Sequence, residues 1–346
     1  MTNDPDFPLT RRAFTFAASA LAVGGNFARA AKAEGGKMKA VQYAEYGVDK
    51  PIAVAEVAKP KAEAGQVLIR VHAAGINPID WKVRNGLFAG LVQNLPIIPG
   101  YDVAGEVAEV GNGVTQFKTG DQVYAMLPLT APGGFAEYVA VAADLVARKP
   151  TKASMEQAAG LPLAGLTAYQ ALVVDGKLTN GQTVLIHGAG GGVGHFAVQI
   201  AKAQGATVIG TGSDRSIGFI KALGADKTVN YKTEKFEDVA KDVDLVFDTV
   251  GGETLSRSYA VVKKGGGIVS LQAAPDAAEA EKAGLQIAKH TVVNPNGAHL
   301  KVLADLVNDG KLNVEVAKTY GLNEAGDALK QSEAGGNHGK LVMKLV

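Results

Sequence analysis

From residue 38 onwards, apolar and polar positions form a regular pattern. Short apolar segments, among them 67–73, 100–110 and 121–125, are separated by turns that contain Gly or Pro. Short apolar segments bounded by such turn residues are typical of β-strands. We therefore predict that this half of the chain is mostly β-structure, and that a last strand at 341–346 returns to it.

A second pattern begins after residue 172, where apolar strands alternate with segments whose apolar residues recur at the spacing of a helix. The predicted strands are 183–187, 207–210, 244–248 and 267–271, and the predicted helices include 196–204 and 217–223. Strands that alternate with helices are typical of a doubly wound parallel sheet. The fold class expected is therefore α/β, with a β domain before a parallel-sheet domain.

The N-terminal segment has the pattern of an export signal. Its apolar segment, 14–27, is shorter than the roughly 20 residues that span a membrane, so no stable membrane span is expected. Arg11-Arg12 precede it, and small-residue sites follow at 28–33. This order resembles the twin-arginine signal. We predict a signal at 1–33 and a periplasmic protein, or a cytoplasmic one if the signal does not function.

Charge and composition exclude several classes of function. The chain has 35 Lys+Arg against 34 Asp+Glu, so it lacks the basic excess of a nucleic-acid binder. It has no cysteine, which excludes disulfides, iron–sulfur ligation, thiolate zinc sites and a cysteine nucleophile. None of its six histidines stands four residues from another. We therefore expect no metal site and no nucleic-acid partner.

A glycine-rich turn follows the predicted strand 183–187 and opens a helix. In dinucleotide-binding proteins the coenzyme's pyrophosphate lies against such a helix N-terminus, where free N–H groups favour anions and any Cβ would hold the phosphates away. Ala189, Gly191 and Gly194 occupy the three fingerprint positions, the first with Ala in place of Gly. The predicted pyrophosphate-binding residues are Ala189, Gly190, Gly191, Gly192, Val193 and Gly194.

The end of the second strand of this domain indicates which coenzyme is used. NAD-binding proteins place a carboxylate there, and this chain has Gly212 instead, followed by Ser213 and Arg215. A hydroxyl and a guanidinium can hold a 2′-phosphate, which favours NADP. Asp214 could still turn towards the ribose and favour NAD. If Gly212 leaves room for the phosphate, Gly212→Asp is expected to shift the preference towards NADH.

Several motifs resemble the medium-chain dehydrogenase/reductase superfamily and, within it, the zinc-free quinone oxidoreductases related to zeta-crystallin. They include Gly181-Gln182, Gln199 and Lys202 around the glycine turn, Asn77-Pro78-Ile79-Asp80, and Pro99-Gly100-Tyr101-Asp102. The resemblance spans 38–346. It implies a GroES-like domain at 38–155 completed by 307–346, a Rossmann domain at 156–306, and a homodimer.

The resemblance also implies the residues of a cleft between these domains. Asn77 and Tyr101 match the positions of zinc ligands in the alcohol dehydrogenase branch. We expect Asn77 to donate to a substrate carbonyl, Tyr101 to donate or to form an aromatic wall, and Asp80 to orient them. A turn residue before Pro78 is the alternative for Asn77, and packing is the alternative for Tyr101. Expected near the coenzyme are Tyr231, Val250, Gly251 and Lys340, the last with a solvated surface role as its alternative.

These features predict a zinc-independent reductase. Without a Lewis acid, the easy substrates are already electrophilic, such as quinones and activated alkenes, to which NADPH would transfer hydride. One alternative is a nucleotide-binding structural or sensing protein with little turnover. Another is an alcohol dehydrogenase that lost zinc but kept alcohol substrates.

The export signal predicts a specific effect of replacing Arg11 and Arg12 together by Lys. The change keeps the charge but removes the guanidinium pair, so we expect unprocessed precursor to accumulate in the cytoplasm. Cell fractionation with mass measurement of both forms checks this. A Lys-Lys variant that reaches the periplasm as well as the unmodified chain would show that another signal operates.

Overall fold

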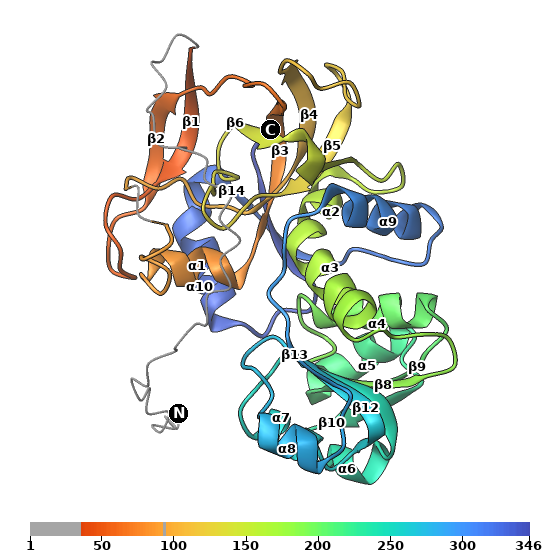
Figure 1. Ribbon diagram of the computed structural model, residues 1–346. Helices are drawn as coiled ribbons and strands as arrows, with labels where there is room; N and C mark the ends of the chain where they lie inside the picture. The colour runs from red at the N-terminus through yellow and green to blue at the C-terminus, as the bar shows by residue number, and fades with distance from the viewer. Residues whose placement is uncertain (1–35, 93–94) are drawn as a thin grey trace. The chain divides into compact units, whose positions relative to one another are not determined.

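A mainly antiparallel sheet is formed by the first half of the chain together with its C-terminal end (Figure 1). The computed structural model describes residues 36–92 and 95–346. The strands are β3(Gln66–Ile76), β4(Asp102–Val110), β5(Gln122–Met126), β6(Tyr138–Ala142), β7(Val146–Arg148), β14(Val316–Gly321) and β15(Lys340–Lys344). Their order is β14-β15-β3-β4-β5-β7, with β6 also paired to β3. A separate antiparallel pair consists of β1(Lys37–Gln42) and β2(Ala53–Ala58).

A six-stranded parallel sheet forms the other part, in the order β10-β9-β8-β11-β12-β13. Its strands are β8(Thr183–His187), β9(Thr207–Gly212), β10(Lys227–Asn230), β11(Val243–Asp248), β12(Val262–Ser270) and β13(Ile287–His290). The helices α4(Gly194–Ala203), α5(Asp214–Ala222), α6(Phe236–Val239), α7(Glu253–Ser258) and α8(Ala277–Lys282) connect them. Counted from β8, this order is 3-2-1-4-5-6, that of dinucleotide-binding domains. The predicted fold class is confirmed.

Two strand boundaries differ from the prediction. Strand β9 continues to Gly212, two residues beyond the predicted end, and β12 begins at Val262 instead of residue 267. The three glycines at 265–267 lie inside β12, but of these only Gly267 is paired in register with β11 and β13. The register shifts between Val262 and Gly267, and Gly265 has a φ of +81°, so the early part of β12 contains an irregularity that glycine tolerates.

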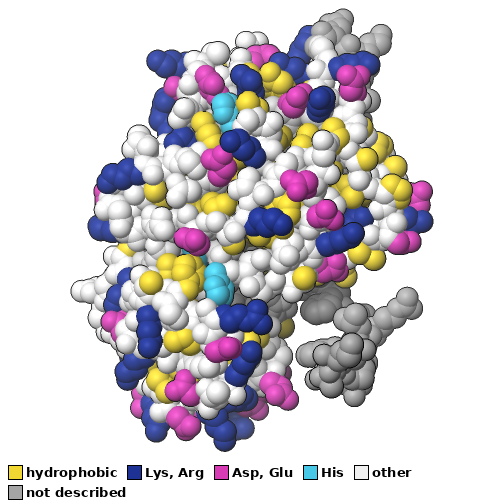
Figure 2. Space-filling model, turned by 180° about the vertical axis from the view of Figure 1, so that it is seen from behind, with side chains coloured by type: hydrophobic (Ala, Val, Ile, Leu, Met, Phe, Trp, Pro, Cys, Tyr) yellow, Lys and Arg dark blue, Asp and Glu magenta, His cyan; other side chains and the backbone are white. Residues whose placement is uncertain are grey.

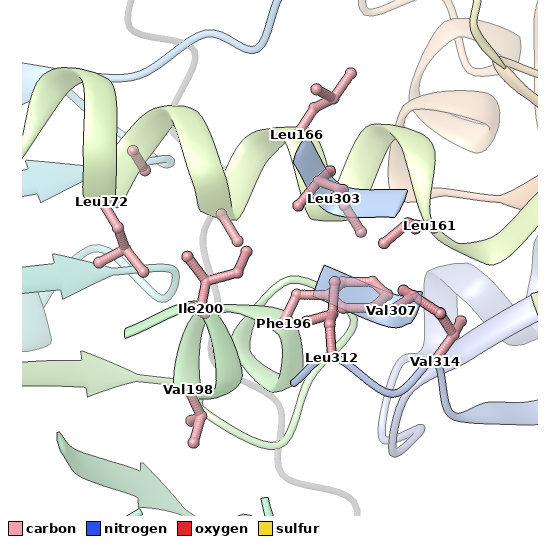
Figure 3. Packing of buried hydrophobic residues seen from close by; sticks show 14 of the residues in the cluster. Leu161, Leu166, Leu172, Phe196, Val198, Ile200, Leu303, Val307, Leu312 and Val314 are labelled. Atoms are coloured by element: carbon pink, nitrogen blue, oxygen red, sulfur yellow. The ribbon is translucent and has the colours of Figure 1, made fainter. Parts of the chain in front are cut away.

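A continuous apolar core joins the two sheets. Helix α2(Met155–Gly160) packs on β3 and β4, while α3(Pro162–Tyr169) packs against α4 and α9(Gly297–Asn308). In Figure 3, Ile200 of α4 points towards the side of Leu166 and Leu172, and Val198 points the opposite way. Because residues of both sheets belong to this one core, the core does not show where one domain ends and the next begins. The domain borders after residues 155 and 306 therefore stay predictions.

The surface carries charges of both signs. On the face shown in Figure 2, Lys and Arg side chains are interspersed with Asp and Glu. In the part of the chain that the structure describes, no helix has the length and apolar character needed to cross a bilayer. Residues 1–33, the predicted export signal, lie outside the described residues.

Candidate active site

The glycine turn between β8 and α4 is held tightly by its neighbours. A Cβ at Gly194 would collide with the carbonyl oxygen of Gly188 and lie 2.7 Å from the Cα of Ala189, and one at Gly190 would lie 2.8 Å from the Cβ of Ser216. His195 donates through Nδ1 to the carbonyl oxygen of Gly191 at 3.0 Å. Burial lowers the pKa of His195 to about 4, so the ring is neutral at pH 7. These contacts fix the conformation of the turn.

A cavity of about 220 Å³ lies against this turn. Gly191 and Gly192 line it together with Pro78, with Gly339 before β15 and with Lys340, the first residue of β15. A Cβ at Gly192 would lie 3.7 Å from the carbonyl oxygen of Gly339 and from the Cδ of Lys340, so this residue faces the segment that carries both. Val193 is the N-cap of α4, and Ala189 is fully buried. A helix N-terminus, a bare glycine backbone and a lysine together fit an anionic pyrophosphate.

The structure corrects the interpretation of Gly212 at the end of β9. A Cβ there would collide with Ser216 and lie 2.5 Å from the Cδ1 of Ile220, so Gly212 permits the close packing of α5 on the sheet. The expectation that Gly212→Asp changes only the coenzyme preference is therefore wrong. A side chain at this position also disturbs the packing of α5. The main-chain N–H of Tyr231 donates to the Gly212 carbonyl at 3.1 Å, and the Tyr231 ring is exposed.

Cationic side chains lie near the end of β9. Asp214 forms an ion pair with Lys232 at 3.1 Å, and this contact holds the pKa of Asp214 below its usual range. Its carboxylate is thus engaged by a lysine that the sequence analysis did not single out. Ser213 is the N-cap of α5, and Arg215 is exposed in the first turn of this helix. The region combines a hydroxyl with two cations.

The turn after β11 carries the predicted Val250 and Gly251. The buried carboxylate of Asp248 accepts the main-chain N–H groups of Val250 and Gly251, each at 3.0 Å. Gly251 has a φ of +79°, which favours glycine. The Val250 side chain is exposed. Asp248 therefore fixes the shape of a turn at the carboxyl end of the sheet, the edge at which ligands bind in such folds.

Asp80 organises the start of α1(Pro78–Arg84). Its carboxylate accepts the N–H of Asn77 at 2.7 Å and the N–H of Gly100 at 3.1 Å. The side chain is completely buried, and it joins the helix to the segment that carries Tyr101. The orienting role expected for Asp80 thus has a geometric basis, although its carboxylate does not reach the cavity surface.

Tyr101 lies within an apolar cluster. Its side chain is 1% exposed and packs with Tyr43, Val83 and Ile97. Its hydroxyl lies 3.4 Å from the carbonyl oxygen of Leu129, which is long for a hydrogen bond. Burial raises the pKa of this hydroxyl. The structure thus places Tyr101 in packing, the alternative that the sequence analysis gave, and not in the wall of either cavity as a donor or aromatic wall.

A second cavity, of about 410 Å³, lies next to this cluster. Val92 and Ile97 belong to both the cluster and the cavity wall, and the rest of the wall includes Pro96 and residues 130–132.

Asn77, Asp102 and Lys340 form a buried polar chain. The Asn77 amide nitrogen donates to Asp102 at 2.8 Å, and the Lys340 ammonium donates to the Asn77 side-chain oxygen and, at 3.2 Å, to the carbonyl oxygen of Ile76. Lys340 is 3% exposed, so its alternative role on a solvated surface is wrong. The sequence analysis did not select Asp102, although a carboxylate at the start of an apolar strand could have indicated a buried partner.

Burial dominates the electrostatics of this group. Removal from water raises the pKa of Asp80 to about 7 and that of Asp102 to about 6, each from an ordinary 3.8. The same cause lowers the pKa of Lys340, while the two carboxylates oppose that change. The group therefore holds two acids that titrate near neutral pH beside one cation.

Comparisons with known proteins agree on one family. Residues 63–151 match the family described as the alcohol dehydrogenase GroES-like domain, and residues 223–343 match the family described as zinc-binding dehydrogenase. The chloroplast envelope quinone oxidoreductase homologue of Arabidopsis thaliana is 34% identical over 304 residues, which cover 84% of this chain and 92% of the relative. The chloroplastic NADPH-dependent alkenal/one oxidoreductase of the same plant is 37% identical, over 83% of this chain and 74% of the relative.

Solved structures are similar as well. The quinone oxidoreductase from Coxiella burnetii has a TM-score of 0.82 and 39% identity, and the match covers 90% of this chain and all of that one. The chain therefore belongs to the medium-chain dehydrogenase/reductase superfamily. Within it, the chain groups with quinone oxidoreductase homologues, and it is an oxidoreductase with a nicotinamide coenzyme.

The residues present do not fit the zinc that one family description implies. The sequence has no cysteine, and residues 36–92 and 95–346 contain no cluster of three His, Asp or Glu side chains that could hold a metal ion. At the positions matched to zinc ligands, the Asn77 amide is engaged by Asp102 and Lys340, and Tyr101 is packed.

The raised pKa of Asp80 predicts a pH dependence of stability. Between the unfolded pKa of 3.8 and the folded pKa of about 7, the folded state binds more protons, so stability falls as the pH rises through this window. Asp80→Asn should flatten that fall, measured as the free energy of urea unfolding across the window. In Asp121→Asn the fall should persist, because the pKa of Asp121 is lowered and such a group makes stability rise, not fall, with pH. An unchanged slope in Asp80→Asn would contradict the prediction.

Proposed function

We propose that the protein is a zinc-independent reductase that transfers hydride from NADPH to quinones or α,β-unsaturated carbonyl compounds. The observation that carries the proposal is the cavity between the glycine turn and Lys340, which fits the coenzyme's phosphates. The names of the relatives, quinone oxidoreductase and alkenal/one oxidoreductase, support this class of substrate.

The coenzyme, when bound, supplies the hydride, and the chain supplies binding and alignment. The glycine turn and Lys340 bind the anionic phosphates. Asp80 and Asn77 fix the start of α1, whose Pro78 lines the same cavity. Quinones and enones suit such a site, because they accept hydride without a Lewis acid to polarise them.

A preference for NADPH over NADH is supported at the end of β9. Asp214 is paired with Lys232 and is not free to repel a 2′-phosphate, while Ser213 and Arg215 offer a hydroxyl and a guanidinium. A charge-assisted contact contributes on the order of 1.5 to 3 kcal/mol. One such contact is enough for about a tenfold preference.

Steady-state oxidation of NADPH with a panel of quinones, enones and simple alcohol–ketone pairs tests the function. We expect turnover with quinones or enones, and no loss of activity in a strong chelator. Coenzyme binding without turnover would favour the structural or sensing alternative. Turnover restricted to alcohols and ketones would favour an alcohol dehydrogenase that lost its zinc.

Arg215→Ala tests the coenzyme preference. Loss of the guanidinium should lower kcat/KM for NADPH by roughly tenfold and leave that for NADH nearly unchanged, because only NADPH carries the 2′-phosphate. Lys221→Ala, which removes an exposed cation from the last turn of the same helix, is the matched control and should keep the ratio. A ratio that Arg215→Ala leaves untouched would contradict the assignment.

Location and assembly complete the proposal. We propose export through the twin-arginine signal at 1–33, supported by the order of its motifs. We also propose a homodimer through one edge of the parallel sheet. Strand β13 forms one of its two edges, and three of its four residues, Ala288, Lys289 and His290, are exposed.

A further inference from the structure

We propose that Asp102 is a positioning residue for coenzyme binding, which acts through Asn77 to hold the Lys340 ammonium at the cavity. The proposal rests on the proposed function, since it takes the cavity as the site of the coenzyme's phosphates. Asp102 is fully buried and does not line the cavity, so it can act on the coenzyme only through other side chains.

A main-chain group sets the direction of the hydrogen-bond chain. The N–H of Leu163 donates to one carboxylate oxygen of Asp102 at 2.8 Å. Leu163 is in the first turn of α3, where an N–H has no partner inside the helix and can only donate. The other oxygen of Asp102 accepts from Asn77 at 2.8 Å. An ionised carboxylate has no hydrogen to donate, so the amide of Asn77 must turn its nitrogen towards Asp102.

The side-chain oxygen of Asn77 consequently faces Lys340. That oxygen and the carbonyl oxygen of Ile76 accept two of the three N–H bonds of the ammonium. Among the described residues that line the cavity, Lys340 is the sole charged one. These two acceptors leave one N–H of the ammonium, and we infer that this N–H serves an anion in the cavity.

The charged and titratable groups around this chain come from several elements. Asp80 on α1 and Asp102 on β4 act on Lys340 of β15, and Lys340 acts on His195 of α4. The hydroxyl groups of Tyr43 and Tyr101 interact electrostatically with Asp80. Above the pKa of Asp102, the chain from Leu163 to Lys340 has a donor facing an acceptor at every step.

Two single substitutions break this pattern. In Asp102→Asn, the N–H of Leu163 requires the new amide oxygen, so the new amide nitrogen faces the nitrogen of Asn77. If the side-chain amide of Asn77 then rotates, its nitrogen faces the Lys340 ammonium, and two hydrogen-bond donors face each other there instead. In Asn77→Asp, two carboxylates face each other. Each variant leaves one buried mismatch, which costs about 1 to 3 kcal/mol for an unsatisfied group.

The double substitution Asn77→Asp with Asp102→Asn restores the pattern. The amide oxygen at 102 accepts from Leu163, the amide nitrogen at 102 donates to the carboxylate at 77, and that carboxylate accepts from Lys340. The number of charges in the group is unchanged. The double substitution should restore stability as well, so the Kd values are compared at a temperature at which thermal unfolding shows every variant to be folded.

The experiment measures the Kd for NADPH by fluorescence titration, at a pH above the pKa of Asp102, in the unmodified protein, both single variants and the double variant. We expect each single variant to bind about tenfold more weakly, and the double variant to return to within about threefold of the unmodified protein. Asp121→Asn is the matched control. This variant also removes a buried carboxylate, but one that lies just before β5, at the opposite end of that strand from the residue that pairs with Asp102. It should therefore leave the Kd unchanged.

Thermal unfolding and circular dichroism of every variant separate binding from folding. If Asp102→Asn does not fold, Asn77→Ser takes its place, because it removes the amide that links Asp102 to Lys340, and it should lose affinity to the same extent. Single variants that bind like the unmodified protein, or a folded double variant as weak as the single ones, would overturn the proposal. No binding of NADPH by the unmodified protein would instead overturn the proposed function, and the role of Asp102 with it.

Discussion

The burial of one lysine is the constraint on which the site depends. Lys340 starts β15, which returns from the C-terminal end of the chain to pair with β3, so that Leu341 lies opposite Ile76. A buried ammonium needs hydrogen-bond partners and a compensating charge. Asn77, Ile76 and the two carboxylates Asp80 and Asp102 supply them. The strand, the start of α1 and the start of β4 therefore have to meet at one place.

This meeting point also joins the two sheets. Asp102 is bound to the first turn of α3, a helix that packs against α4 and α9 in the core that both sheets share. Helix α4 in turn begins at the glycine turn. The polar group on one side of the cavity and the turn on the other are thus connected through a few tightly packed helices. Such a connection favours a fixed geometry at the cavity, which suits a site whose contribution is alignment.

Much of the fold follows from local patterns in the sequence. The alternation of apolar strands with helical segments predicted the parallel sheet, and the glycine turn after β8 lies where the motif placed it. Such patterns are readable because they depend on neighbours a few residues apart. The early part of β12 was missed, because the glycines at 265–266 form an irregular stretch whose main-chain hydrogen bonds go to Gly284 and Gln286 on a different segment.

The sequence by itself determined the order of elements, the coenzyme turn and the lack of cysteine ligands. Only the tertiary structure decided which polar side chains meet. Lys340 and Asn77 are 263 residues apart, and Asp102 and Leu163 are 61 apart, so no local pattern connects them. Gly212 likewise lies against α5, and Asp214 faces Lys232, for reasons of packing and charge in space. Burial and partner choice depend on the whole fold, because the cost of removing a charge from water is set by everything that surrounds it.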